Sequence, residues 1–331
     1  MLMILNLHSF WGYDHGNGFL KAFDFFRNTT SICAVDTFIL ISGYFGIKWK
    51  FKSFFNLVFQ LFFYSFAVYG VSVASGFLLF DKSELILCFK ALYDCWGFVT
   101  CYIVLWFVSP WLNAFADKRN KRQLFLFILI FFLAENIIMR ASVDVLNFCL
   151  IYLIGRLIKK TGAVGNEKCK PGVAFWIITV VIFILAYAAN IILHYDALTM
   201  GSFILGYSYS SPFVILQAIS LFLYFGKLDI QSRWINWCAV SCLSIYLIHM
   251  HPAIKQIGYY VFTETLYNYP FFEHIGLLLC LIIIVFICSI FIDKIRIQIS
   301  DLFYSFIHYL CIKLRIKEIK LESFIPDWSK V

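Results

Sequence analysis

Apolar side chains occur along this chain in long runs that are separated by short polar segments. Most runs approach the roughly 20 residues that a helix needs to cross the apolar core of a bilayer. The runs cover residues 1–10, 29–47, 54–80, 93–116, 123–139, 143–158, 173–194, 203–225, 235–256 and 272–292. The pattern therefore predicts an all-α protein, a polytopic transmembrane helical bundle of about ten spans.

The two ends of the chain depart from this pattern. The first run ends at Phe10, before the polar stretch from Gly12 to Gly18, and it is about half as long as a crossing requires. We therefore expect a truncated first span, whose missing part lies upstream of Met1. From Lys294 onward apolar and basic residues alternate, which predicts an amphipathic helix on the membrane surface. This divides the chain into a transmembrane domain, residues 1–293, and a cytoplasmic basic tail, residues 294–331.

The composition also points to a lipid environment. Hydrophobic residues make up 62% of the chain and charged residues 14%, which leaves too little polar surface to coat a soluble protein. The net charge of +8 is therefore interpreted loop by loop rather than as a nucleic-acid interface. Of the 27 basic residues, 21 fall on alternate loops and in the tail, and the basic side is expected to be cytoplasmic. The other six are Lys21, Arg27, Lys82, Lys90, Arg140 and Lys255.

Ionisable side chains inside apolar runs are the candidates for chemistry, because they are costly there. His8 has the residue type of a general base near neutral pH. On local sequence alone, however, an interfacial histidine anchored to a headgroup or a loop carbonyl is the favoured interpretation. Asp36 has almost wholly apolar neighbours and needs a partner, which is compatible with a structural bond or with orienting a base. Glu135 is assigned a structural role, either paired with Arg140 or directed outward.

A second pair of histidines, His249 and His251, flanks Met250. Residues at i and i+2 point to different helix faces and no third ligand is evident, so a metal site is not expected. A hydrogen bond across helices is the simpler interpretation of His249. The eleven cysteines show no CxxC or Cys/His metal spacing and are interpreted as packing residues.

Other residues admit both a structural and a functional interpretation. Ser42 and Gly43 form a small pair suited to close helix packing. Tryptophans such as Trp96 fit an aromatic belt, and rings beside a cleft can also stack on sugars. The lysines after the second run fit an orientation signal or a contact with anionic lipid, and they would also suit a phosphate-bearing cofactor. These lysines are Lys48, Lys50 and Lys52.

Four segments taken together resemble the acyltransferase 3 family of bacterial inner-membrane proteins, which move acyl groups, commonly acetyl, from acyl-CoA to hydroxyls of surface glycans. The first is His8 in the first run. The second is AVDTFILISGYF, residues 34–45, which resembles the family's glycine-valine-aspartate to serine-glycine-tyrosine stretch. The others are WGFVTCYIVLWFVSPWLNAF, residues 96–115, and SCLSIYLIHMHP, residues 241–252.

The resemblance implies a function and a set of roles. His8 would be the catalytic base with Asp36 orienting the site, and Lys48, Lys50 and Lys52 would contact coenzyme A. Acetyl-CoA or another acyl-CoA would be a donor substrate rather than a bound cofactor, and a lipid-linked or surface glycan the acceptor, at the bacterial inner membrane with the C-terminus cytoplasmic. Five further residues would contact the substrate or line the cavity that holds it, namely Ser42, Tyr44, Trp96, Tyr246 and His249.

The sequence departs from the family pattern at a few positions. The arginine that members carry about three turns before the histidine would lie upstream of Met1. Ala34 and Ile39 replace a usual glycine and a usual aromatic residue. Lysines stand where many members carry an arginine pair, and lysine lacks the planar fork of arginine.

A transporter or flippase for lipid-linked glycan is the alternative from another class, with the buried histidine and aspartate gating protons or substrate. Inverted halves and a matching pair of broken spans are usual marks of such transporters. This sequence shows neither feature.

Overall fold

The computed structural model describes residues 1–10, 18–92, 96–138, 144–166, 170–193, 208–255 and 258–313. Every regular element in these ranges is helical, as expected for an all-α protein. The α-helices are α1 (Leu2–Leu7), α2 (Gly18–Ser31), α3 (Ala34–Phe45), α4 (Phe51–Ala74), α5 (Lys82–Phe89), α6 (Gly97–Lys118), α7 (Lys121–Leu133), α8 (Asp144–Thr161), α9 (Pro171–Leu193), α10 (Pro212–Gly226), α11 (Arg233–Ala239), α12 (Cys242–His249), α13 (Pro252–Lys255), α14 (Tyr259–Thr265) and α15 (Phe271–Lys313). A π-helix, η1 (Ala134–Ile138), and two 3-10 turns, η2 (Ala163–Gly165) and η3 (Leu266–Asn268), complete the set.

Four helices in the described part are long and apolar enough to cross a membrane. They are α4, α6, most of α9 (Pro171–Ala188) and most of α15 (Phe271–Ile307), and α10 is a shorter apolar helix. All four fall on predicted runs. The expectation of about ten spans is thus supported only in part, because the other described helices are shorter or, in the case of α8, carry more charged residues.

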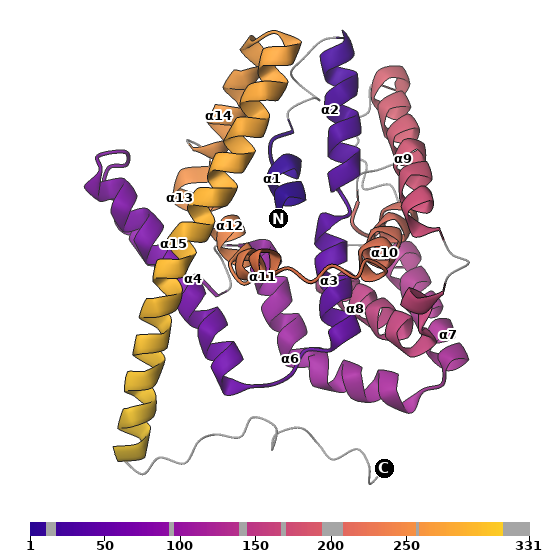
Figure 1. The fold of residues 1–331 in the computed structure, drawn as a ribbon, viewed down its shortest axis with the longest axis horizontal. Coiled ribbons are helices and arrows are strands. Elements are labelled where there is room, and N and C mark those ends of the chain that lie inside the picture. Colours follow the sequence, from indigo (N-terminus) through magenta and orange to yellow (C-terminus); the bar gives the residue numbers. More distant parts are fainter. Residues whose placement is uncertain are drawn as a thin grey trace.

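The run predicted at 29–47 is built from two helices. α2 ends at Ser31 and α3 begins at Ala34, and Figure 1 shows α3 continuing below α2 across the height of the molecule. The run at 235–256 is divided into α11, α12 and α13. Pro252 opens α13, where its missing N–H costs nothing because the first turn has no acceptor for it.

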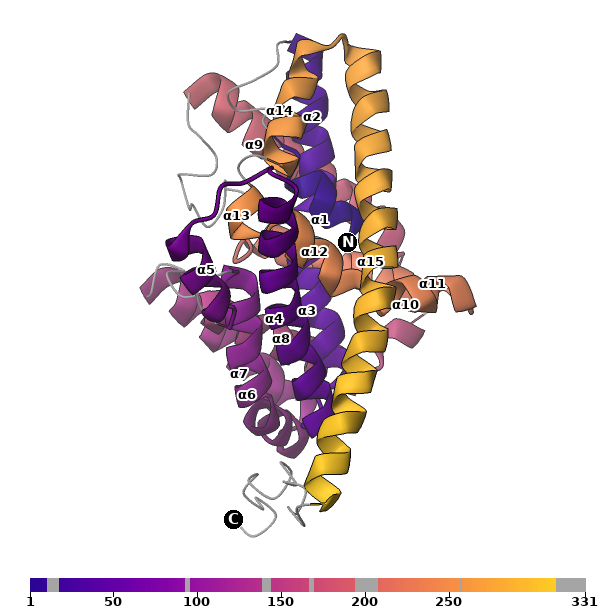
Figure 2. The ribbon, with the colours of Figure 1, turned by 90° about the vertical axis from the view of Figure 1, so that its left-hand side faces the viewer.

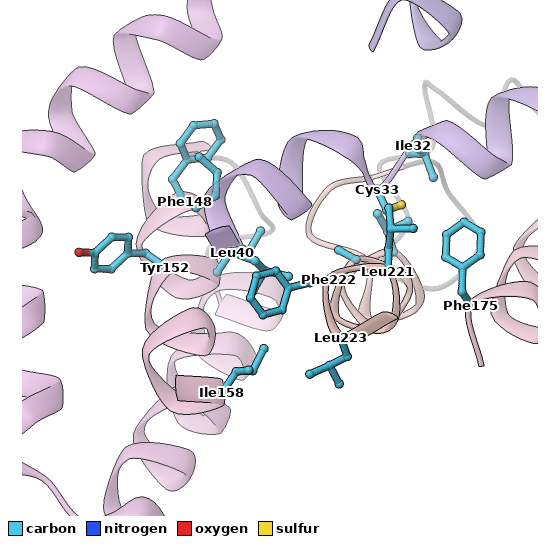
Figure 3. Close-up of a cluster of buried hydrophobic side chains, with 14 of the residues drawn as sticks. Ile32, Cys33, Leu40, Phe148, Tyr152, Ile158, Phe175, Leu221, Phe222 and Leu223 are labelled. Carbon is cyan, nitrogen blue, oxygen red and sulfur yellow. The ribbon is translucent and has the colours of Figure 1, made fainter. Parts of the chain in front are cut away.

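The tightest helix contact joins α3 to α8. A Cβ added to Gly43 would lie 2.2 Å from the carbonyl oxygen of Tyr152, and one added to Gly155 would lie 2.5 Å from that of Leu40. The two backbones therefore touch, as small residues allow between membrane helices. Figure 3 shows side chains from α3, α8 and α10 meeting around this contact, including Leu40 and Phe222.

α15 runs along one side of the molecule from one end to the other (Figure 2). It carries a buried polar cluster at its contact with α4: Arg296 binds both carboxylate oxygens of Asp293, and the hydroxyl of Tyr64 donates to that carboxylate. The helix continues without a break past residue 293, the expected domain boundary, to Lys313. The rest of the expected basic tail, residues 314–331, lies outside the described residues.

Candidate functional site

α1 is short and lies in the middle of the molecule, between α2 and α15 (Figure 1). Arg27 of α2 holds its C-terminal end. The guanidinium donates to the backbone oxygen of Asn6 at 2.9 Å and to its side-chain oxygen at 2.7 Å, and to the hydroxyl and backbone oxygen of Ser9 at 2.6 and 3.1 Å. The bonded residues, Asn6 and Ser9, precede and follow His8 in the sequence. Arg27 therefore fixes the backbone that carries the histidine.

Two further contacts anchor this segment. The side-chain amide of Asn6 donates to the hydroxyl of Ser31 at 2.7 Å, and the Tyr259 hydroxyl of α14 donates to the backbone oxygen of Leu5 at 2.8 Å. Arg27 itself is paired with the fully buried Asp24 at 2.9 Å. α1 is thus tied to α2 and to α14 by buried or half-buried polar bonds.

His8 and His249 form the pair at the centre of the site. Nδ1 of His8 lies 2.9 Å from Nε2 of His249, and the ring centroids are 5.1 Å apart. The other nitrogen of His249, Nδ1, is hydrogen-bonded to the backbone oxygen of Ile245. Tyr246 completes the group, with its ring centroid 6.1 Å from that of His8. Residues 241 positions apart in the chain therefore form one cluster.

A cavity of about 470 Å³ adjoins this pair, within the range of small-molecule sites. His8 and Tyr246 line it together with side chains from α3, α6, α8 and α10. The lining is largely apolar, with polar groups from Thr37, Asn147 and Asp144. Among the described residues, Nδ1 of His8 is hydrogen-bonded and Nε2 has no partner. The cavity thus has an imidazole in its wall with one nitrogen available.

Asp36 makes no hydrogen bond to the histidine pair in the described part of the chain. It is fully buried in α3, and neither carboxylate oxygen has a hydrogen-bond partner in the described residues. Its neighbours Val35 and Thr37 line the cavity, but Asp36 does not. Glu135 in the π-helix is also buried, and its carboxylate has no hydrogen-bond partner among the described residues. Arg140, one of its two expected environments, lies outside those residues. Among the described residues, no hydrogen bond joins Asp36 to His8, and Asp36 is not in the cavity wall that His8 lines.

The other candidate residues fall into different places. Ser42 donates to the backbone of Phe38 and lies 3.5 Å from the Tyr102 hydroxyl, while Tyr44 packs on Phe222 of α10. Trp96 is buried at the start of α6, edge-on to His251. Of the five residues expected to contact the substrate or line the cavity, only Tyr246 is among the lining residues. His249 is hydrogen-bonded to another lining residue, His8.

His251 is occupied elsewhere. Its Nδ1 accepts from the backbone N–H of Ala253 at 3.2 Å, and its Nε2 is 3.0 Å from the backbone oxygen of Ser65 in α4. The two histidines that flank Met250 thus bind different partners; α12 ends at His249, and His251 lies in the link before α13.

The lysines at 48, 50 and 52 are exposed where α3 ends and α4 begins. Lys52 is 3.9 Å from Asp301 and lies over the ring of Tyr304 in α15. Figure 1 shows this link at the lower end of the molecule, toward which α6 and α15 also end. These lysines therefore belong to one end of the molecule, separate from the histidine pair.

Arg27 is the residue at this site that the sequence analysis did not identify as functional. It was counted only as a basic residue on the less basic side. Asp24 and Arg27 lie three residues apart in an amphipathic helix, with two phenylalanines between them, and this spacing is a signal of an ion pair. What that spacing does not reveal is the partner helix that receives the remaining guanidinium bonds.

Comparison with known proteins gives one result. Searches of curated proteins and of solved structures find no match to this chain. The family model described as "Acyltransferase domain" matches residues 1–294, a range that includes all four sequence segments and both histidines of the pair. The chain is a member of the acyltransferase 3 family.

Proposed function

We propose that the protein is a membrane-embedded O-acyltransferase that moves an acyl group, acetyl in the simplest case, from acyl-CoA to a hydroxyl of a lipid-linked or cell-surface polysaccharide. The observation that carries the proposal is His8, whose Nδ1 is bonded to His249 while the ring lines a largely apolar cavity. In a member of an acyltransferase family, an available imidazole nitrogen in a cavity wall is suited to general base catalysis.

The reaction balances with His8 alone as the proton carrier. Nε2 takes the proton of the acceptor hydroxyl as the oxygen attacks the thioester carbonyl carbon, giving a tetrahedral intermediate. The carbon–sulfur bond then breaks, and the leaving thiolate takes the proton from Nε2. The products are an ester and free coenzyme A, with His8 returned to its neutral form.

The charge distribution and the cavity suggest how the two substrates enter. Lys48, Lys50 and Lys52 are exposed at one end, where they would attract the phosphates of coenzyme A from a cytoplasmic face of the inner membrane. Two cavity residues, Ile41 and Phe225, are 42% and 59% exposed. Apolar residues at an opening favour contact with lipid, which fits an acceptor carried on a lipid.

The alternative is a transporter or flippase for lipid-linked glycan, and one experiment separates the two. The full chain is reconstituted in vesicles that contain lipid-linked saccharides extracted from the source membrane, and radiolabelled acetyl-CoA is added. An acyltransferase releases free thiol and transfers label to the saccharide, and both depend on the extract. Movement of saccharide across the vesicle membrane without thiol release would instead establish the transporter.

A further inference from the structure

The bonds of the histidine pair determine which nitrogen of each ring carries a proton. A carbonyl oxygen only accepts hydrogen bonds, so Nδ1 of His249 must donate to Ile245. A neutral imidazole has a single N–H, and therefore Nε2 of His249 has a lone pair directed at His8. Nδ1 of His8, 2.9 Å away, must then be the donor. This leaves Nε2 of His8 unprotonated.

The opposite direction of this hydrogen bond, with His249 as the donor to His8, requires a charged His249 ring. If Nε2 of His249 carried a proton as well, His249 would be an imidazolium. His249 is 4% exposed, and the rings of Tyr246 and Tyr259 pack edge-on against it. No carboxylate is paired with it among the described residues, and burying an unpaired charge is strongly unfavourable. The neutral arrangement is therefore the favoured one.

We propose that His249 is a positioning residue, which, anchored on the carbonyl of Ile245, holds His8 as the Nδ1–H tautomer with the lone pair of Nε2 available in the cavity. This inference rests on the proposed function. It assigns to His249 a role other than the expected cavity lining, because its action on the substrate passes through His8.

This hydrogen bond to His249 supports both proton steps of the reaction, uptake from the acceptor and release to the thiolate. When Nε2 of His8 takes the proton of the acceptor, Nδ1 keeps its own proton and its bond to His249, so the imidazolium is stabilised by an acceptor already in place. The proton then leaves from the same Nε2 to the thiolate. No proton passes to His249, and His249 remains neutral throughout.

His251 provides a control within the same segment. Because its Nδ1 accepts from the N–H of Ala253, its proton must be on Nε2, where it donates to Ser65. It is also buried, at 2% exposed. The structure thus assigns opposite tautomers to two buried histidines that are two residues apart, which makes the assignment testable inside one protein.

The test is a two-bond ¹⁵N–¹H spectrum of the full chain, labelled with ¹⁵N-histidine, in lipid nanodiscs. Signals are assigned by their loss in His8→Ala, His249→Gln and His251→Gln. The expected result is protonated Nδ1 in His8 and His249 and protonated Nε2 in His251. A His8 ring protonated on Nε2 in the wild-type protein would overturn the proposal.

Variants of His249 test the consequence for the rate. His249→Phe keeps a ring but removes the acceptor, and we expect thiol release from acetyl-CoA to fall about tenfold or more, the equivalent of one lost hydrogen bond. His249→Gln restores an acceptor oxygen near the position of Nε2 and should remain within about threefold of wild type. His251→Gln should leave the His8 tautomer unchanged.

The outcomes separate this inference from the proposed function. If His8→Ala leaves thiol release unaltered, the base assignment fails whatever the tautomer. If His8→Ala abolishes release but the His8 tautomer is the same in His249→Phe as in wild type, only the role of His249 fails. Should His249→Phe not fold, the wild-type spectrum decides.

Discussion

Arg27 links the position of α1 to the stability of the fold. Its pair with Asp24 is buried, with the two side chains 9% and 0% exposed, and its other nitrogens bind Asn6 and Ser9 on either side of His8. Removing one partner of a buried ion pair leaves an uncompensated charge, at a cost of about 3–5 kcal/mol. The same side chain therefore supports folding and the position of the proposed base.

Substitution of Arg27 should separate these two contributions. We expect Arg27→Met to lower the free energy of unfolding by about 3 kcal/mol and thiol release by more than tenfold. Adding Asp24→Asn removes the unpaired charge and should recover part of the stability without recovering activity, because the bonds to α1 remain absent. Thermal unfolding and thiol release per folded protein measure the two effects, with the exposed Arg233→Met as control. A double variant with wild-type activity would show that Arg27 does not position His8.

The sequence identified some residues of this site and not others, for a physical reason. An ionisable side chain in an apolar run is visible without a structure, which is why His8 and His249 were found. Their direct contact was not predictable, because 241 positions separate them. Asp36 has the same local signal as His8, yet the register of α3 directs Thr37 and not Asp36 to the cavity. That choice depends on how α3 packs against α8 and α10.

Among the helix contacts, the one between α3 and α8 gives a direct prediction for stability. We expect Gly43→Ala to lower the free energy of unfolding by about 1–3 kcal/mol, because the new Cβ would lie 2.2 Å from the backbone oxygen of Tyr152. Gly70→Ala in α4 is the matched control, since its Cβ meets nothing within 4 Å; this change should be neutral or stabilising, as alanine favours helix by about 1 kcal/mol. Thermal unfolding in one detergent compares them. Equal effects of the two substitutions would contradict the close backbone contact.

Hydropathy located whole helices better than it located breaks in them. The runs at 54–80, 93–116, 173–194 and 272–292 correspond to α4, α6, α9 and α15. An apolar run gives no signal where a helix stops and restarts inside protein, because neighbouring helices can satisfy the freed backbone groups. The interruption between α2 and α3 at Ile32 and Cys33, both buried, is of this kind. The run at 235–256 contained one visible signal, Pro252.

Across the whole molecule, the distribution of Lys and Arg predicts the orientation in the membrane. The α3–α4 and α6–α7 connections carry basic residues and lie toward one end of the molecule (Figure 1). By the positive-inside rule we expect this end to face the cytoplasm. An epitope inserted after Arg119 should be inaccessible to antibody in intact spheroplasts, and one inserted after Gly76, between α4 and α5, should be accessible. The reverse labelling would invert the orientation and the proposed route of acyl-CoA.

The central claim is that His8 is the base of an acyl transfer, and a rate measurement tests it most directly. Thiol release from acetyl-CoA is followed for wild type, His8→Ala and His251→Gln, in nanodiscs with the extracted lipid-linked saccharides. General base catalysis is worth roughly 10²–10⁴-fold, so His8→Ala should lose about that factor while His251→Gln stays close to wild type. An unchanged rate in folded His8→Ala would contradict the account.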